Sequence, residues 1–402
     1  MQNRLNGRIA ATIGALVLAL GALGAMPKAR AAEEVDVAII SFAPYSAWYI
    51  VKEKGLAEGI DVNVRIIEGI QAKNSAITTG GIQCMNNTVD SIVSAVSNGV
   101  PMEIVAFSNM SYGLDKMVAT EEIQGARDFE GKSYGADLGF LNHMWMLLTL
   151  ERAGLDYDAA DLVVLLPQQS TAAFVSGSID IDVNYLPFVA QSLERDGAHV
   201  LKSSLSDRTW ERGLIGDSIA CNSEWVDKNP ETAQELLRAW FEAVNWWKEN
   251  PEEGNRIVAE GLGWDEGEVR LNMHGAIELN LSQNLGAFGV DGVQAVCKDL
   301  PEGVPKASPD SEGWGELFNG EDCINGYAGP TWELFNRVYK EVGVAGSDVP
   351  ADKGLNPAVV RALKDAGHLE TYTSNQWIGR LPLPDKYNDP RLWQADHPAS
   401  GH

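Results

Sequence analysis

Short apolar runs alternate with amphipathic segments from Val35 onward, and this alternation predicts a sheet flanked by helices. Val35–Ser41 has the length and apolar content of a buried strand, and Ser46–Gly55 has helical spacing that ends at a glycine. The pattern repeats along the chain and indicates an α/β fold. Predicted strands are 35–41, 61–67, 82–86, 102–107, 117–119, 132–136, 162–166, 181–184 and 218–222. Predicted helices are 46–55, 71–79, a segment from about 88, 142–153, 170–176 and a segment from 230.

The segment after Asn229-Pro230 is the clearest helix, because Asn caps helix starts and Pro favours the first helical position. Its apolar residues keep helical spacing and are predicted to form core rather than a ligand platform. They are Ala233, Leu236, Leu237, Trp240, Phe241, Val244 and Trp247. From about Asp291 the pattern mixes short helices with loops, and Leu381–His402 is predicted to be an irregular, Pro-rich tail.

The first 32 residues are predicted to be an export signal. Arg4 and Arg8 precede the nearly all-apolar run Ile9–Ala25, and Ala29-Arg30-Ala31 fits a small-residue cleavage site. The alternative is an uncleaved membrane anchor, but the run is at the short limit for a span. We therefore expect a periplasmic protein with no membrane-inserted segment after cleavage.

The chain is strongly acidic, with a net charge of −25 that would become −29 without the basic signal. Such a charge repels nucleic acid and anionic membrane surfaces, so neither is an expected partner. About 370 mature residues exceed one typical core, so two lobes are expected. Four cysteines in an oxidising compartment are compatible with disulfides. Cys297 and Cys323 flank a loop rich in Gly, Pro and Asp and are the predicted pair, whereas Cys84 and Cys221 are either buried thiols or a second bridge.

Four turns between the predicted elements carry polar or aromatic groups. Helix N-termini point unpaired N–H groups outward, so ligands collect at the turns between strands and helices. These four turns contain no Arg or Lys, which an anion site would be expected to use. Carboxylates and ring faces instead suit a small cation. The turns are 42–48, 86–90, 109–115 and 137–142.

Asp115 and Asp137 are the predicted charge-recognition groups, one from each lobe, because neither occupies an obvious helix cap. Tyr45 and Trp48 are predicted to form an aromatic wall, although Trp48 is equally compatible with a core position. Asn86, Thr88 and Asn142 have capping as the simpler interpretation.

Catalytic signatures are absent from the sequence. It has no G-x-S-x-G elbow, phosphate loop, G-x-G-x-x-G turn or H-E-x-x-H helix, and no C-x-x-C metal pair. We therefore expect no cofactor, no metal and no catalysis. The alternative from another class is an enzyme acting on a small amide, with His143 as a base.

The ordered motifs resemble the periplasmic solute-binding proteins of ABC importers of the nitrate/sulfonate/taurine type. The resemblance covers roughly 35–290 and is carried by 42–48, 79–83 before Asn87 and Asp90, 99–101, 128–131, 135–154, 176–182 and 229–231. Within that family, GFLNHMWMLLTLERAGL, SYGLD and LNLSQNLGAF are similar to the subgroup associated with urea carboxylase and guanidine. Two features depart from the family: Gly81-Ile82-Gln83-Cys84 stands where Gly-x-x-Asp is usual, and the region after Asp291 is different.

The resemblance implies two α/β lobes, the second inserted into the first, closing on a ligand in the cleft between them. Crossings are expected near 118–121 and 206–215, which gives lobe 1 as 33–118 plus 215–380 and lobe 2 as 119–214. The resemblance also implies a membrane permease and an ATPase as partners. The preferred ligand is guanidine or a urea-like compound, and the alternatives are taurine or another sulfonate, nitrate or hydroxymethylpyrimidine. The expected ligand contacts are Tyr45, Trp48, Asn87, Asp90, Tyr112, Asp115, Asp137, Phe140, His143 and Tyr185.

Overall fold

The structure is a computed structural model that describes residues 32–207, 209, 213–291, 318–319, 322–323, 326–372, 378, 381–393 and 395, with backbone only at 318–319 and 322–323. The chain divides into two units, Met1–Glu33 and Glu34–His402, and the cavities discussed below belong to the second. Nearly all of the expected signal segment lies outside the described residues. None of the helices that are described is long and apolar enough to cross a membrane.

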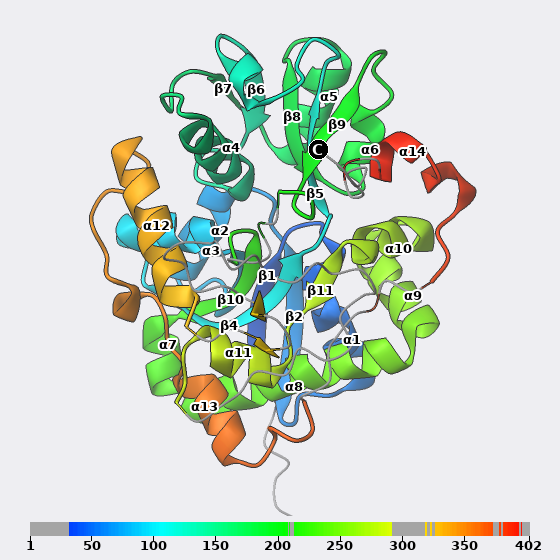
Figure 1. The fold of residues 1–402 in the computed structure, drawn as a ribbon. Helices are drawn as coiled ribbons and strands as arrows, with labels where there is room; N and C mark the ends of the chain where they lie inside the picture. Colours follow the sequence, from blue (N-terminus) through cyan, green and yellow to red (C-terminus); the bar gives the residue numbers. More distant parts are fainter. Residues whose placement is uncertain are drawn as a thin grey trace, which may run out of the picture. The chain divides into compact units, whose positions relative to one another are not determined.

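A six-stranded mixed sheet forms the first half of the fold (Figure 1). Its β1 and β3 strands are parallel, whereas β10 runs antiparallel to both β3 and β4. In spatial order the strands are β11 (Ala276–Glu278), β4 (Met102–Ser111), β10 (Gly216–Asn222), β3 (Cys84–Thr88), β1 (Glu33–Ile39) and β2 (Ile60–Ile66).

A five-stranded mixed sheet forms the second half. The strands β6, β7 and β8 are parallel, and β5 runs antiparallel to β8 and β9. In spatial order they are β7 (Asp161–Val164), β6 (Ser133–Ala136), β8 (Ile181–Tyr185), β5 (Asp115–Ala119) and β9 (His199–Ser203). The two sheets confirm the predicted α/β class. A separate short hairpin pairs β12 (Phe318–Asn319) with β13 (Asp322–Cys323).

Helices follow most of the strands. The α8 helix packs against α1, α9 and α13, and its predicted apolar stripe is buried, which confirms the core interpretation. The helices up to the second lobe are α1 (Ala47–Lys54), α2 (Ile70–Thr78), α3 (Val89–Ser97), α4 (Leu141–Ala153), α5 (Pro167–Val175) and α6 (Phe188–Ser192). Later come α7 (Ser223–Lys228), α8 (Pro230–Glu249), α9 (Pro251–Leu262), α10 (Glu266–His274), α11 (Leu281–Ala287), α12 (Ala328–Glu341), α13 (Ala358–Asp365) and α14 (Pro390–Trp393). Short 3₁₀ turns are η1 (Ala43–Tyr45), η2 (Ala126–Phe129), η4 (Ala351–Lys353) and η5 (Asp385–Tyr387).

Among the described strands from β1 to β11, the chain changes from one sheet to the other at two places. The first passage is at 112–114, between β4 and β5, and the second is at 204–215, between β9 and β10. The first lies a few residues before the expected crossing at 118–121, because all of β5 pairs with β8 and β9. The β9 strand was not predicted, since the charged Lys202 interrupts its apolar run. The exact extent of each lobe stays a prediction.

A disulfide joins Cys84 to Cys221. These residues face each other in the register of β3 and β10, with their Cα atoms 4.0 Å apart. This resolves the alternative between buried thiols and a bridge in favour of the bridge. The predicted pairing of Cys297 with Cys323 stays a prediction, because Cys297 and the side chain of Cys323 lie outside the described residues.

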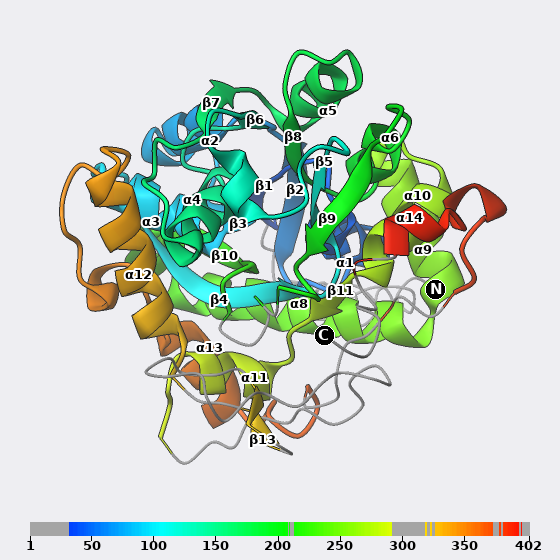
Figure 2. The same ribbon diagram turned by 45° about the horizontal axis from the view of Figure 1, so that its top comes forward.

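The C-terminal region contacts elements of both sheets. The α12 helix packs against α3 and also against α4, and α14 packs against β9 (Figure 2). The segment from Leu381, predicted to be an irregular tail, contains two short helical turns in its described part. Pro384 directly precedes η5, and Pro390 is the first residue of α14, a position that proline favours.

Candidate functional site

A small cavity, which we call the central cavity, is lined by residues from both sheets. Its volume, taken as the space open to the centre of a water-sized sphere, is about 10 Å³, close to the roughly 10–15 Å³ that one water molecule needs. This is far below the range of roughly 300–1,000 Å³ that is usual for drug-sized ligands, so any ligand larger than water requires the cavity walls to move apart. The lining residues are Ile40, Phe42, Tyr45, Thr88, Asp115, Phe140, Leu141, Tyr185 and Asp217.

Strand register brings the polar lining residues together. In the five-stranded sheet, Asp115 at the start of β5 lies opposite Tyr185 at the end of β8. In the six-stranded sheet, Asp217 in β10 lies opposite Thr88 at the end of β3. Each sheet therefore contributes one carboxyl group to the central cavity.

Aromatic rings form much of the remaining lining. The Phe42 ring lies 4.8 Å from the Tyr45 ring and 5.1 Å from the Tyr185 ring, both edge to face. The Tyr185 hydroxyl has no hydrogen-bond partner among the described residues. Asn272 fixes this corner by accepting from the Ala43 N–H at 2.9 Å and donating to the Leu186 carbonyl, so it joins loops from both sheets.

The two cavity carboxyl groups have raised pKa values. Burial raises the pKa of Asp115 to about 7, although hydrogen bonding to Ser111 and the charge of Lys116 act in the opposite direction. Burial and repulsion from Asp115 raise the pKa of Asp217 to about 8, against the effect of its hydrogen bond with Tyr45. Without a cation, both groups therefore hold protons for much of the time near neutral pH.

Four of the ten predicted ligand contacts line the central cavity, namely Tyr45, Asp115, Phe140 and Tyr185. Sequence reasoning missed Asp217, because it searched the turns before helices, whereas Asp217 lies in a strand that returns from the other sheet. One sequence feature could have pointed to Asp217. It is an acid that lies just after the second expected crossing at 206–215 and just before the predicted strand 218–222.

Trp48 is a core residue and does not line the central cavity. Its side chain is fully buried against Trp240, with ring centroids 4.8 Å apart. Its indole N–H donates to Asn86 Oδ1 at 2.7 Å. Of the two residues predicted to form an aromatic wall, Tyr45 lines the central cavity and Trp48 does not. The first turn of α1 directs the Trp48 indole toward α8.

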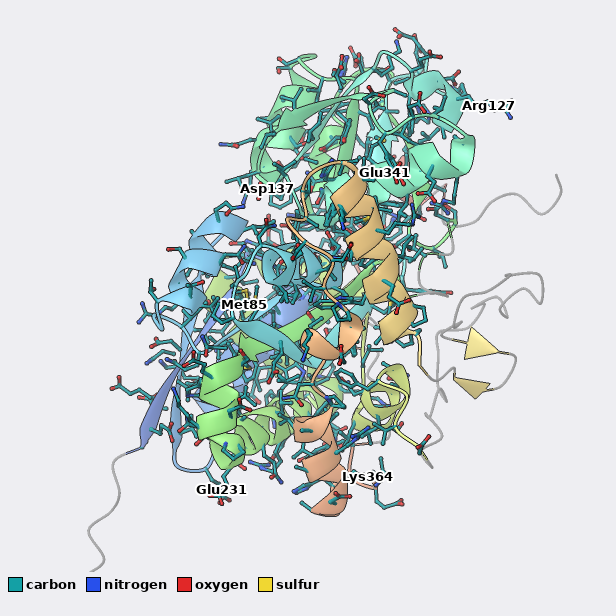
Figure 3. All side chains as sticks on the ribbon, turned by 90° about the vertical axis from the view of Figure 1, so that its left-hand side faces the viewer. Met85, Arg127, Asp137, Glu231, Glu341 and Lys364 are labelled. Atoms are coloured by element: carbon teal, nitrogen blue, oxygen red, sulfur yellow. A yellow bond between two sulfur atoms is a disulfide. The ribbon has the colours of Figure 1, made fainter. Side chains whose placement is uncertain are left out.

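Asp137 also lies away from the central cavity lining. Its carboxylate accepts a hydrogen bond from the backbone of Ile70, the first residue of α2, and is near the Lys73 ammonium group. In Figure 3, Asp137 lies where the end of β6 approaches α2. The expected acid pair Asp115 and Asp137 is thus replaced at the cavity by Asp115 and Asp217.

Asn87, Asp90 and Tyr112 are buried near the cavity without lining it. Asn87 Oδ1 accepts from the Thr88 N–H at 3.1 Å, and the Tyr112 N–H donates to the Gly275 carbonyl at 2.7 Å. Burial raises the pKa of Asp90 to about 6. Asp90 Oδ2 accepts from the Tyr339 hydroxyl of α12 at 2.6 Å, so these polar groups are held by contacts within the fold rather than lining the central cavity.

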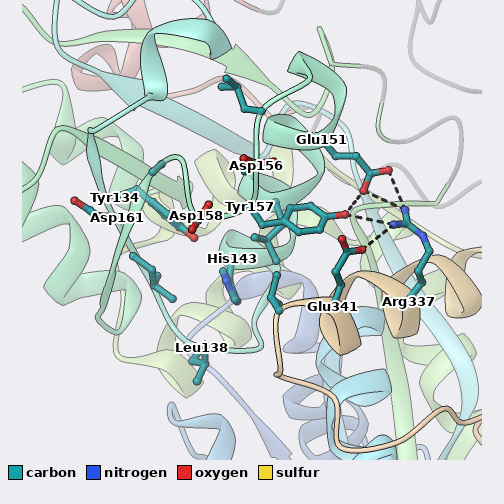
Figure 4. A pocket seen from close by; sticks show the side chains of 15 residues that line it. Tyr134, Leu138, His143, Glu151, Asp156, Tyr157, Asp158, Asp161, Arg337 and Glu341 are labelled. Atoms are coloured by element: carbon teal, nitrogen blue, oxygen red, sulfur yellow. Dashed lines mark hydrogen bonds and ion pairs between the residues drawn. The ribbon is translucent and has the colours of Figure 1, made fainter.

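His143 lines a second, more open space that we call the outer cavity, between α4 and α12 (Figure 4). This cavity, measured in the same way, has a volume of about 870 Å³ and a charged rim that includes Glu151 and Arg337. The His143 ring is stacked between Tyr134 at 6.5 Å and Tyr339 at 5.9 Å. Burial lowers the pKa of His143 to about 4, so the imidazole is neutral at physiological pH. His143 thus faces a different space from the two cavity carboxyl groups.

Two fully buried cations lie near the cavity acids: Lys116 in β5, next to Asp115, and Lys73 in α2. Lys73 in α2 is fully buried, and its Nζ lies 3.5 Å from the Asn86 carbonyl oxygen. Burial lowers its pKa to about 8, against the attraction of Glu68, Asp137 and Asp217.

Residues 43–254, more than half of the chain, match a protein family described as NMT1/THI5 like. A Brucella abortus protein that is provisionally named a binding protein, with no ligand in its name, is 26% identical over 253 residues. That alignment covers 62% of this chain and 78% of the relative. The taurine-binding periplasmic protein of Escherichia coli K12 is 24% identical over 200 residues, covering 48% of this chain and 62% of that protein.

Solved structures of periplasmic binding proteins share the fold. The aliphatic sulphonate binding protein SsuA of Escherichia coli superposes with a TM-score of 0.60 at 14% identity, covering 82% of this chain and 99% of that one. The nitrate-binding protein NrtA of Synechocystis PCC 6803 gives 0.59 at 16% identity, covering 84% and 89%. The desulfurization enzyme DSZB also matches, at 0.52 and 14% identity, covering 83% and 99%. The two-lobed fold therefore occurs in both binding proteins and an enzyme.

Proposed function

Because the chain belongs to the NMT1/THI5-like family, we propose that it is the substrate-binding component of an ABC importer. In this proposal the central cavity captures a small nitrogen-containing solute, with guanidine or a urea-like cation preferred. The loaded protein delivers this solute to a membrane permease driven by an ATPase. Removal of the signal over 1–32 would release the protein into the periplasm.

The observation that carries the proposal is that Asp115 and Asp217 line one small cavity from two different sheets. Two buried carboxyl groups repel each other when ionised, and a cation between them would remove that cost. Planar guanidinium has N–H donors around its edge and a face that suits aromatic rings. The rings of Phe42, Tyr45 and Tyr185 supply such faces, and the free Tyr185 hydroxyl can accept a hydrogen bond.

A zwitterion such as taurine is the second candidate. The specific observation in its favour is Lys73, a buried cation whose charge interacts with Asp217. An amine could then contact the carboxyl groups while a sulfonate approaches the lysine. Lys73 is not among the residues that line the central cavity, and for that reason we prefer the cation.

Catalysis is the less favoured function. The proposed base of a small-amide hydrolase, His143, lines the outer cavity rather than the central one. An enzyme would need its base within hydrogen-bond reach of the reacting group. The fold is shared with a desulfurization enzyme, so turnover of the bound compound is worth measuring.

Isothermal calorimetry on the mature protein tests the proposed function with guanidinium chloride, urea, taurine, nitrate and hydroxymethylpyrimidine. We expect binding of guanidinium or a urea-like compound and no turnover. Binding of taurine alone would overturn the cation assignment, and turnover of any bound compound would overturn the assignment as a binding protein. The variant Asp217→Asn separates binding in the central cavity from binding elsewhere.

A further inference from the structure

The α12 helix connects the two halves of the fold next to the central cavity. It packs against α3 of the six-stranded half and against α4 of the five-stranded half. At its outer end, Arg337 forms an ion pair with Glu151 of α4 at 2.9 Å, and the Tyr157 hydroxyl donates to Glu151 (Figure 4). The family match ends at 254, so α12 lies outside it.

Tyr339 in α12 contacts a residue that lines the central cavity. Its hydroxyl donates to Asp90 Oδ2 at 2.6 Å and lies 3.2 Å from the Phe140 carbonyl oxygen. Asp90 is in the first turn of α3, whereas Phe140 caps α4 and lines the central cavity. One buried hydroxyl therefore contacts a group from each half of the fold.

The Phe140 carbonyl is also the first acceptor of α4. It accepts from the His143 N–H at 2.9 Å and from the Met144 N–H at 3.1 Å. A contact at this carbonyl therefore acts on the start of α4, which carries both Phe140 and Leu141 of the cavity lining. The stack of the Tyr339 ring on His143 holds the same turn from the side.

We infer that Tyr339 is a positioning residue for the proposed ligand: through Asp90 and Phe140 it holds the α4 wall of the central cavity against the six-stranded half. The α12 helix thereby sets how long the closed cavity retains its ligand. This inference rests on the proposed function and adds a residue that does not itself contact the ligand.

Tyr339→Phe tests the inference because it removes the hydroxyl and keeps the ring stack. The matched control is Tyr327→Phe, since Tyr327 is a buried tyrosine at the start of the same helix whose hydroxyl has no hydrogen-bond partner among the described residues. Hydrogen exchange of the His143 and Met144 amides is measured without ligand. Stopped-flow measurement with guanidinium then gives the association and dissociation rate constants.

We expect Tyr339→Phe to speed exchange at these two amides and to raise the dissociation rate constant roughly tenfold, the size of one lost buried hydrogen bond. The association rate constant should stay near that of the wild type, and Tyr327→Phe should change neither readout. Amide exchange and dissociation equal to those of the control would overturn the inference.

A second variant and a ligand-independent measurement cover the cases in which the first experiment gives no answer. If Tyr339→Phe unfolds because Asp90 is left as a buried charge, Tyr339→Phe combined with Asp90→Asn removes that charge and should still show fast exchange and fast dissociation. If the wild type does not bind guanidinium, the proposed cation assignment fails. The exchange measurement, which needs no ligand, still decides whether Tyr339 holds the start of α4.

Discussion

The carboxyl group of Asp115 shares the central cavity with that of Asp217, although the two residues belong to different sheets. Their mutual repulsion is one cause of the raised pKa of Asp217, after burial. The same two groups that would bind a cation are therefore costly to ionise without one. A positively charged ligand would lower the free-energy cost of ionising both carboxyl groups. It would therefore favour the conformation in which residues of both sheets contact the ligand.

Replacing either cavity acid by asparagine should weaken cation binding and leave the fold intact. Asn keeps the size and resembles the protonated acid, but it cannot ionise in the unfolded chain, so the free energy of unfolding near neutral pH should rise rather than fall. The lost charge should cost about 2–5 kcal/mol of binding, as for other buried charge pairs. Calorimetry with guanidinium on Asp115→Asn and Asp217→Asn measures the loss.

Asp137→Asn is the matched control for these two variants, because Asp137 is an acid near the cavity but outside its lining. Its affinity for guanidinium should stay close to that of the wild type. Equal affinity in all three variants would show that the cavity acids do not bind the ligand.

Cation binding should release protons and should strengthen as the pH rises. The pKa values of Asp115 and Asp217 are about 7 and about 8, so both groups are partly protonated near pH 7. Guanidinium stays charged throughout this range and binds the ionised form. Affinity should therefore rise between about pH 6 and 8 and level off above, and calorimetry in buffers of different ionisation enthalpy should detect the protons. A pH-independent affinity would contradict the two-acid site.

The ligand-free protein should lose stability as the pH rises from about 4 to 8. In the unfolded chain both acids ionise near their ordinary pKa of about 3.9, whereas in the folded protein they hold their protons up to about 7 and 8. The folded state thus binds more protons in this window, so the free energy of unfolding falls by up to about 1.4 kcal/mol per pH unit for each group. Thermal unfolding at several pH values measures this slope without adding urea or guanidinium, and Asp217→Asn should reduce it.

Trp48 and Tyr45 should respond differently to substitution, although they are three residues apart. Trp48→Ala removes a fully buried ring and should lower the free energy of unfolding by about 3–5 kcal/mol. Tyr45→Phe keeps its ring and removes the hydrogen bond to Asp217, which normally lowers the pKa of that acid. In the Tyr45→Phe variant, the affinity for guanidinium should therefore begin to rise at a higher pH than in the wild type, as calorimetry can measure. A stable Trp48→Ala protein with weakened binding would place Trp48 in the site after all.

The sequence patterns predicted elements better than they predicted the site. The α4 and α8 helices begin within a residue of their predicted starts, because their apolar spacing and, for α8, Pro230 at the first helical position are local signals. The cavity depends instead on pairing between distant segments, such as Asp217 opposite Thr88. Trp48 could not be separated from the ligand wall by sequence alone, since its partner Trp240 lies on a helix far along the chain. Tyr339 was not considered, because its role depends on where α12 packs.

The bond between Cys84 and Cys221 has a consequence for proteolysis. The cysteines are 137 residues apart, and the chain between them includes every strand of the five-stranded sheet. A protease that cuts once within this stretch would leave two fragments still joined through the sulfur atoms. The nicked protein would migrate as a full-length species on a non-reducing gel and separate only after reduction, so a cut in the five-stranded half need not detach the two fragments from each other.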